Sequence, residues 1–199
     1  MFASLQPEHI VEAAGLVGIL AIIFAESGLF FGFFLPGDSL LFSAGLFASQ
    51  GHIDIWWLVI GSAVAAIVGD SVGYAFGKKV GPALFSREDS VIFHKRHAAR
   101  AKAFSEKYGP KAIVMARFVP IVRTFAPIVA GVGGMAYRTF IVWNVLGGAL
   151  WTLLLSLSGY FLGRAYPSIG GYIDWIVLAI IALSLIPVGI EWARAKRGV

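Results

Sequence analysis

Long apolar runs separated by short polar interruptions dominate the chain, and this pattern predicts a helical membrane protein. Three runs are long and apolar enough to cross a bilayer, which takes about 20 helical residues; they cover 53–77, 140–162 and 172–192. Trp56 and Lys78 lie at opposite ends of the first of these runs, and aromatic and cationic residues are what membrane interfaces select. We therefore expect an all-α polytopic fold.

The apolar run 10–35 does not predict a simple crossing. It ends at Pro36-Gly37-Asp38, and apolar sequence then resumes only from Leu40 to Ala48, which is too short to span. Pro36 disfavours helix before it, and Gly37 permits a tight turn. We expect a re-entrant hairpin, which is tolerated at membrane depth only where protein or a wet cavity surrounds it. The alternative is a tight loop outside the membrane between two ordinary spans.

A second broken segment covers 112–132. It contains Arg117 and Arg123 together with Pro120 and Pro127, and no ordinary lipid-facing helix carries such a combination. We expect a second hairpin that turns at these prolines.

The connection 78–111 is strongly basic, with nine Lys and Arg residues. Aromatic and basic side chains recur along one helical face, namely Phe93, His97, Arg100, Phe104 and Tyr108. We expect an amphipathic basic helix on the membrane surface, attracted by anionic lipid. A solvated helix in a loop would explain the same pattern.

A repeat relates the two halves of the chain. Shifting the sequence by 86 residues aligns 44–77 with 130–163 without a gap. The identities include Ala44/Ala130, Gly45/Gly131, Trp57/Trp143, Val59/Val145, Gly61/Gly147, Ala63/Ala149, Gly73/Gly159, Tyr74/Tyr160 and Gly77/Gly163. Each repeat would then hold a hairpin and one span. A hairpin crosses nothing and a span crosses once, so the second repeat must be inverted, as in many secondary transporters.

We therefore expect one membrane domain over residues 1–199. Repeat one covers about 26–77, the basic connection 78–111, repeat two about 112–163, and a last span 172–192. Because Lys and Arg accumulate on the cytoplasmic side, the connection and the C-terminus are expected there, in a multi-pass protein of the inner (cytoplasmic) membrane. Glycines in the spans predict close helix approach, either within one chain or between the copies of a homo-oligomer.

Composition excludes several classes of protein. Charged residues make up 14% of the chain and AVILMFWYC residues 58%, whereas a soluble domain carries about 25% charged residues. The net charge of +5 would suggest nucleic acid in a soluble protein, but here apolar runs separate the charges, and we expect no nucleic-acid partner. The chain has no Cys, which excludes disulfides and thiolate metal sites. We expect no cofactor and no metal.

Ionisable side chains in or beside the broken segments are the candidate site. They are Glu26, Asp38, Arg117 and Arg123, and charges at membrane depth are functional by default. Arginine favours planar, bidentate contact with phosphate or carboxylate. Asp70, within the span 53–77, is a third candidate acid, or else it caps a tightly packed helix crossing. The structural alternative for the four is mutual ion pairing that only clamps the hairpins.

At these residues the sequence resembles the DedA family of bacterial membrane proteins, also called SNARE-associated or VTT-domain proteins. The matching segments are Glu26-Ser27-Gly28 leading to Pro36-Gly37-Asp38, then Arg117-Phe118-Val119-Pro120-Ile121-Val122-Arg123, Pro127 to Gly131, and Gly159 to Gly163. The resemblance covers roughly residues 10–190. It implies embedded acids at Glu26 and Asp38 and essential arginines at Arg117 and Arg123. It also implies translocation of a lipid, such as undecaprenyl phosphate or a phospholipid, driven by proton motive force.

The chemistry of the residues fits that class. Arg117 and Arg123 would bind an anionic lipid headgroup, and protonation of Glu26, Asp38 or Asp70 would remove a competing charge. Membrane lipids are thus the expected partners. A scaffold without transport is the alternative, and a lipid phosphatase is a further one. An enzyme would need a nucleophile or metal at the site, and all four His lie outside the predicted spans, so we expect no catalytic residue and no enzyme activity.

Overall fold

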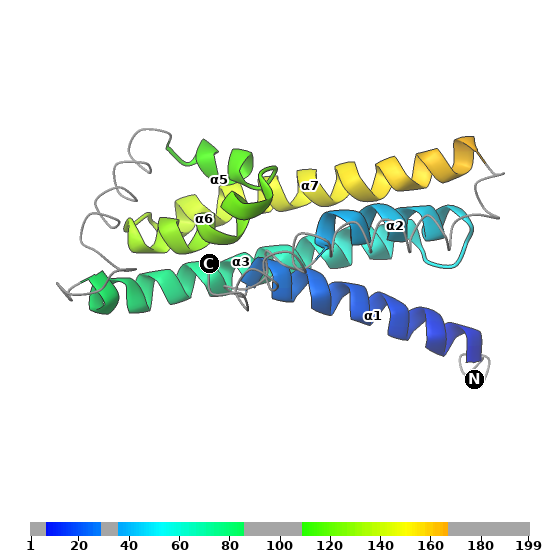
Figure 1. Ribbon diagram of the computed structural model, residues 1–199, viewed down its shortest axis with the longest axis horizontal. Coiled ribbons are helices and arrows are strands. Elements are labelled where there is room, and N and C mark those ends of the chain that lie inside the picture. The colour runs from blue at the N-terminus through cyan, green and yellow to red at the C-terminus, as the bar shows by residue number, and fades with distance from the viewer. Residues whose placement is uncertain (1–6, 29–35, 86–108, 167–199) are drawn as a thin grey trace, which may run out of the picture. The chain divides into compact units, whose positions relative to one another are not determined.

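A computed structural model describes residues 7–28, 36–85 and 109–166, and Figure 1 shows their helices. The helices are α1 (Pro7–Gly28), α2 (Gly37–Ser49), α3 (Ile55–Phe85), α5 (Lys111–Ala116), α6 (Pro120–Val132) and α7 (Tyr137–Ala165). No strand occurs among the described residues, which confirms the all-α class for this part of the chain. Residues 86–108, where the amphipathic helix of the basic connection 78–111 is expected, lie outside the described residues, as does the span expected at 172–192.

The described helices differ widely in length. The helices α3 and α7 each contain a segment long and apolar enough to cross a membrane, Ile55–Val80 and Tyr137–Ala165, close to two of the expected spans. By contrast, α2 and α6 have 13 residues each. At 1.5 Å per residue such helices are about 20 Å long, shorter than the hydrocarbon core of about 30 Å.

The described residues belong to two compact units, and each is considered by itself. Unit 1 comprises Met1–Ile23, Phe34–Ser62 and Thr152–Val199, and unit 2 comprises Phe24–Phe33 and Ala63–Trp151. The helices α1, α3 and α7 thus contribute one part to each unit.

In unit 1, α2 packs against α7 through glycines on both helices. A Cβ added at Gly45 would lie 2.1 Å from the carbonyl oxygen of Ser156, and one added at Gly159 would lie 2.1 Å from that of Phe42. No side chain fits at such distances, so the two backbones are in direct contact. Leu41 and Leu46 on α2 are fully or almost fully buried.

In unit 2, α6 packs against α3 in the same manner. A Cβ added at Gly131 would lie 2.3 Å from the carbonyl oxygen of Tyr74, and one added at Gly77 would lie 2.2 Å from that of Ile128. Around this contact lies a core in which Tyr74 stacks on Phe140 with ring centroids 4.6 Å apart.

The C-terminal end of α1 also approaches α3 in unit 2. A Cβ added at Gly69 would lie 2.7 Å from the carbonyl oxygen of Phe24, and one added at Gly28 would lie 3.1 Å from the carbonyl oxygen of Gly69. The glycines of the first span therefore provide the close helix approach that their spacing predicts.

The contacts explain the residues that the sequence repeat preserves. In unit 1 the short helix of repeat one packs on the long helix of repeat two, and in unit 2 the short helix of repeat two packs on the long helix of repeat one. Gly45 corresponds to Gly131 under the 86-residue shift, and Gly159 and Gly163 correspond to Gly73 and Gly77. Hence the same contact is made twice with the repeats exchanged.

The three prolines predicted at hairpin turns occupy different places relative to the helices. Pro36 directly precedes α2, which begins at the buried Gly37, and Pro120 is the first residue of α6. The prediction for Pro127 is wrong, because this residue lies inside α6. The backbone angle that proline fixes is itself helical, and α6 continues through Pro127 although the ring removes one hydrogen bond and crowds the carbonyl group four residues earlier. The chain breaks instead at Val119, whose backbone is extended (φ −115°, ψ 108°).

We predict that Gly131→Ala destabilises the protein by about 1–3 kcal/mol, the usual cost of overpacking, since the added methyl would meet the Tyr74 carbonyl. Gly18→Ala is the matched control, because Gly18 is an exposed residue of α1 with no atom near the added methyl, and alanine favours helix. The free energy of unfolding in detergent measures both. Equal stabilities for the two variants would contradict the direct backbone contact.

Candidate functional site

Two buried ion pairs lie among the helices of unit 2. Glu26, near the end of α1, pairs with Arg123 in the first turn of α6. Asp70, in α3, pairs with Arg117, which caps the C-terminal end of α5. The exposed fraction of the side chain is 2% for Glu26 and 5% for Asp70, so both carboxylates are shielded from solvent.

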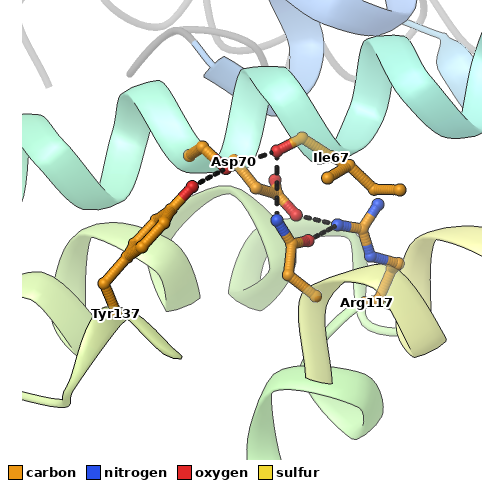
Figure 2. Close-up of polar contacts among 6 residues, drawn as sticks. Ile67, Asp70, Arg117 and Tyr137 are labelled. Atoms are coloured by element: carbon orange, nitrogen blue, oxygen red, sulfur yellow. Dashed lines mark hydrogen bonds and ion pairs between the residues drawn. The ribbon is translucent and has the colours of Figure 1, made fainter. Parts of the chain in front are cut away.

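Arg117 is enclosed more completely than Arg123. Its side chain is 5% exposed, compared with 13% for Arg123. Besides the pair with Asp70, Nη2 of Arg117 donates a 2.7 Å hydrogen bond to Oδ1 of Asn144 on α7. Figure 2 shows Asp70 facing the guanidinium of Arg117, with dashed lines marking the contacts of this group.

Asn144 also fixes the site to α3. Its Nδ2 donates a hydrogen bond of 3.1 Å to the carbonyl oxygen of Ile67, which also accepts one of 2.8 Å from the hydroxyl of Ser71. Tyr137 reaches the Ser71 hydroxyl at 3.4 Å, and Figure 2 shows the resulting line of contacts from Tyr137 to Arg117. Polar atoms of α3 and α7 are thereby joined within an apolar region.

A single indole ring contacts both cations. The guanidinium carbon of Arg117 lies 5.9 Å from the centroid of the Trp151 ring, and that of Arg123 lies 5.1 Å from it. Both distances fall within the range of a cation–π interaction. Trp151 is 3% exposed and is therefore a buried surface shared by the two arginines.

The local sequence explains why the arginines can lie here. The helix α5 ends at Ala116 and the helical backbone is interrupted before Pro120. Arg117 therefore lies directly after α5, and Arg123 lies in the first turn of α6. Gly147 and Gly148 on α7 lie beside the Arg117 side chain, since an added Cβ would be in van der Waals contact with its nitrogens, at 3.5 Å and 3.7 Å. The guanidinium thus packs against α7 at these two glycines.

Four of the five predicted ionisable residues thus meet in unit 2, and the pairing differs in part from the expectation. Glu26, one of the acids expected to compete for the arginines, pairs with Arg123. Asp38 lies in the first turn of α2, in unit 1. The partner of Arg117 is Asp70, which sequence reasoning treated only as a third candidate acid.

Two residues of the site, Asn144 and Trp151, were not predicted. A signal for Asn144 was present, because it is an amide within the otherwise apolar run 140–162. Trp151 had no such signal, since a tryptophan in an apolar helix fits lipid contact as well as a buried core. Its role depends on which way the helix faces.

The chemistry open to this arrangement is anion exchange. Two formal positive and two formal negative charges balance one another, and a buried charge whose partner is removed is costly. A second anion can therefore replace a carboxylate at an arginine only if the carboxylate is neutralised or moves. Among the described residues, no group of three His, Cys, Asp or Glu side chains could hold a metal ion.

Comparisons with known proteins give a consistent result. The family model of the VTT domain matches residues 35–161. Protein DedA of Escherichia coli K12 is 43% identical over 197 residues, which cover 95% of this chain and 90% of DedA. The membrane protein ML0287 of Mycobacterium leprae, named as uncharacterized, is 44% identical over 181 residues, covering 91% of this chain and 81% of that protein.

A more distant relative extends the comparison. The inner membrane protein YghB of Escherichia coli K12 is 31% identical over 191 residues, covering 95% of this chain and 86% of YghB. No solved structure matches the chain. The family model and these relatives, which span nearly all of the sequence, show that the chain is a membrane protein of the DedA family, built on a VTT domain.

Proposed function

We propose that this protein moves an anionic, phosphate-bearing lipid between the leaflets of the inner membrane. The observation that carries the proposal is the buried pair of Glu26 and Arg123 beside the second pair of Asp70 and Arg117. A headgroup crossing the hydrocarbon core needs compensating positive charge at depth, and arginine supplies planar, bidentate contacts to phosphate. Undecaprenyl phosphate and phospholipids both carry such a phosphate, and both belong to the proposed substrate class of anionic, phosphate-bearing lipids.

The two arginines have different roles in the proposal. Arg117 stays fixed, because Asp70 and Asn144 both bind its guanidinium in a nearly inaccessible position. Arg123 exchanges its partner, since its side chain is the more exposed of the two. The incoming phosphate takes the place of Glu26, and Arg117 adds a second positive charge nearby.

Proton uptake makes the exchange possible. When Glu26 is protonated, it no longer competes for Arg123, so phosphate binding and proton uptake favour each other. A potential of 100 mV contributes about 2.3 kcal/mol per charge moved, enough to drive such a step. Asp38 and Asp70 are the other proposed proton-coupling residues, and Asp70 is the one that contacts an arginine of the site.

The proposed architecture is an inverted repeat of a re-entrant hairpin plus a span. It is supported by the short lengths of α2 and α6 and by the exchange of helices between the repeats in the two units. The distribution of Lys and Arg supports a cytoplasmic location for 78–111 and the C-terminus. The name of YghB, an inner membrane protein, supports the same membrane for this chain.

Transport in liposomes tests the function directly. We predict that the purified protein moves fluorescent phosphatidylglycerol between leaflets without releasing phosphate. Arg123→Lys should lower the rate about tenfold, which corresponds to a loss of roughly 1.4 kcal/mol, because an ammonium cannot reproduce two parallel contacts. Arg164→Lys is the matched control, because Arg164 is exposed at the end of α7. Phosphate release would favour the phosphatase alternative, and absence of flipping by the wild type would favour a scaffold.

The role of Glu26 predicts a second result. Glu26→Gln keeps the shape and hydrogen bonding of the side chain but fixes it in a neutral form, so flipping should no longer respond to an imposed proton gradient. Lipid binding should persist, because both arginines remain. Rates with and without a gradient are compared for the wild type, Glu26→Gln and Asp38→Asn. If all three respond alike, neither residue carries the proton, and Asp70→Asn is the variant to examine next.

A further inference from the structure

Two uncharged side chains contact the arginines of the site but are not themselves exchanged for a proton or an anion in the proposed function. Asn144 and Trp151 both lie on α7, are 0% and 3% exposed, and contact the arginines. Neither side chain titrates, so their contacts with the guanidiniums do not depend on pH. The carboxylates, in contrast, lose their attraction for arginine when they are protonated.

The amide of Asn144 is held in one orientation. Its nitrogen donates to the Ile67 carbonyl, so its oxygen must face the Nη2 of Arg117, a group that only donates. An amide in an apolar helix is costly to bury unless it is hydrogen-bonded, and here both of its ends are. Asn144 thus links Arg117 to the backbone of α3 through contacts that remain when Asp70 becomes neutral.

The ring of Trp151 connects the two cations. Both guanidinium carbons lie within 6 Å of its centroid, which holds the arginines close to each other although their charges repel. Glu26 and Asp70 offset that repulsion while both are ionised. Once a proton neutralises one of them, an attractive surface is needed to keep the arginines together.

We propose that Asn144 and Trp151 are positioning residues that keep Arg117 and Arg123 together as a preorganised two-cation site for a phosphate headgroup while a carboxylate is neutral. This inference rests on the proposed function and deepens it. Preorganisation raises affinity because the bound arrangement does not have to be built during binding. Without these residues, protonation would leave the arginines free to separate, and the headgroup would meet a single cation.

The charged and titratable groups near the site come from every element of it. They are Glu26 on α1, Asp70 on α3, Arg117 at the end of α5, Arg123 on α6, and Tyr137, which lies about two turns before Asn144 on α7 and is linked to the site through Ser71. Only the carboxylates change charge in the acidic range. If a variant changes how lipid binding depends on pH, the change therefore concerns the carboxylates or the uncharged contacts that hold the arginines when a carboxylate is neutral.

The test measures binding of phosphatidylglycerol to the purified protein in detergent at several pH values. Wild-type binding should strengthen as the pH falls. For Asn144→Leu we expect about tenfold weaker binding at low pH, the effect of losing a hydrogen bond to a charged group. At high pH the change should be much smaller, because ionised Asp70 still binds Arg117. Asn144→Asp should move the strengthening to lower pH, because one more carboxylate must be neutralised.

The variants of Trp151 give a second comparison. Trp151→Leu should weaken binding at low pH as Asn144→Leu does, whereas Trp151→Phe, which keeps an aromatic ring, should retain most of the affinity. Ser156→Ala is the matched control. It removes a buried hydroxyl from the same helix, but Ser156 belongs to unit 1, whereas both arginines belong to unit 2. The thermal midpoint of each variant is measured alongside binding.

Two outcomes would overturn the inference. One is a loss of affinity in Asn144→Leu that is equal at every pH. The other is a lowered thermal midpoint with an unchanged pH profile, which would show a role in stability only. Failure of the transport proposal is a separate result: lipid flipping would be absent in wild-type liposomes, while the pH-dependent binding and its loss in Asn144→Leu would remain.

Discussion

The need to neutralise charge inside apolar surroundings governs the arrangement of this protein. Four ionisable side chains, Glu26, Asp70, Arg117 and Arg123, are placed where water reaches them little. An isolated charge there would cost several kcal/mol, so each carboxylate must meet a guanidinium. Since the four residues come from α1, α3 and the α5–α6 break, this requirement restricts how those helices can pack.

The helix breaks and the glycines meet that requirement. The extended backbone at Val119 separates Arg117 from α6, which begins at Pro120 and carries Arg123, so both side chains can reach partners on other elements. Glycines bring α6 and the end of α1 into backbone contact with α3, and they shorten the distances that the charged side chains must span. The same close contacts recur in unit 1 between α2 and α7, where the carboxylates and arginines of the site are absent. The glycine contacts thus occur in both units, whereas these ion pairs, each formed between the two repeats, lie in unit 2.

Much of this could be predicted from sequence because its signals are local. Apolar runs of sufficient length predicted α3 and α7, the short apolar run from Leu40 to Ala48 lies within α2, and the identity between Gly45 and Gly131 marked the repeated contact. Pairing was harder to predict, since it depends on which way each helix faces. Asp70 meets Arg117 through the rotation of α3, and Trp151 meets both arginines through the rotation of α7. Pro127 was misplaced because a proline is compatible with either a turn or a helix interior.

The central claim is that a phosphate headgroup replaces Glu26 at Arg123 as Glu26 takes up a proton. Infrared difference spectroscopy of the protein in lipid nanodiscs measures this directly, because a protonated carboxyl group and a carboxylate absorb at different frequencies. Addition of phosphatidylglycerol to nanodiscs of neutral lipid should produce a protonated-carboxyl band in the wild type, and this band should be missing in Glu26→Gln. A wild-type spectrum without the band, or a band that persists unchanged in Glu26→Gln, would contradict the account.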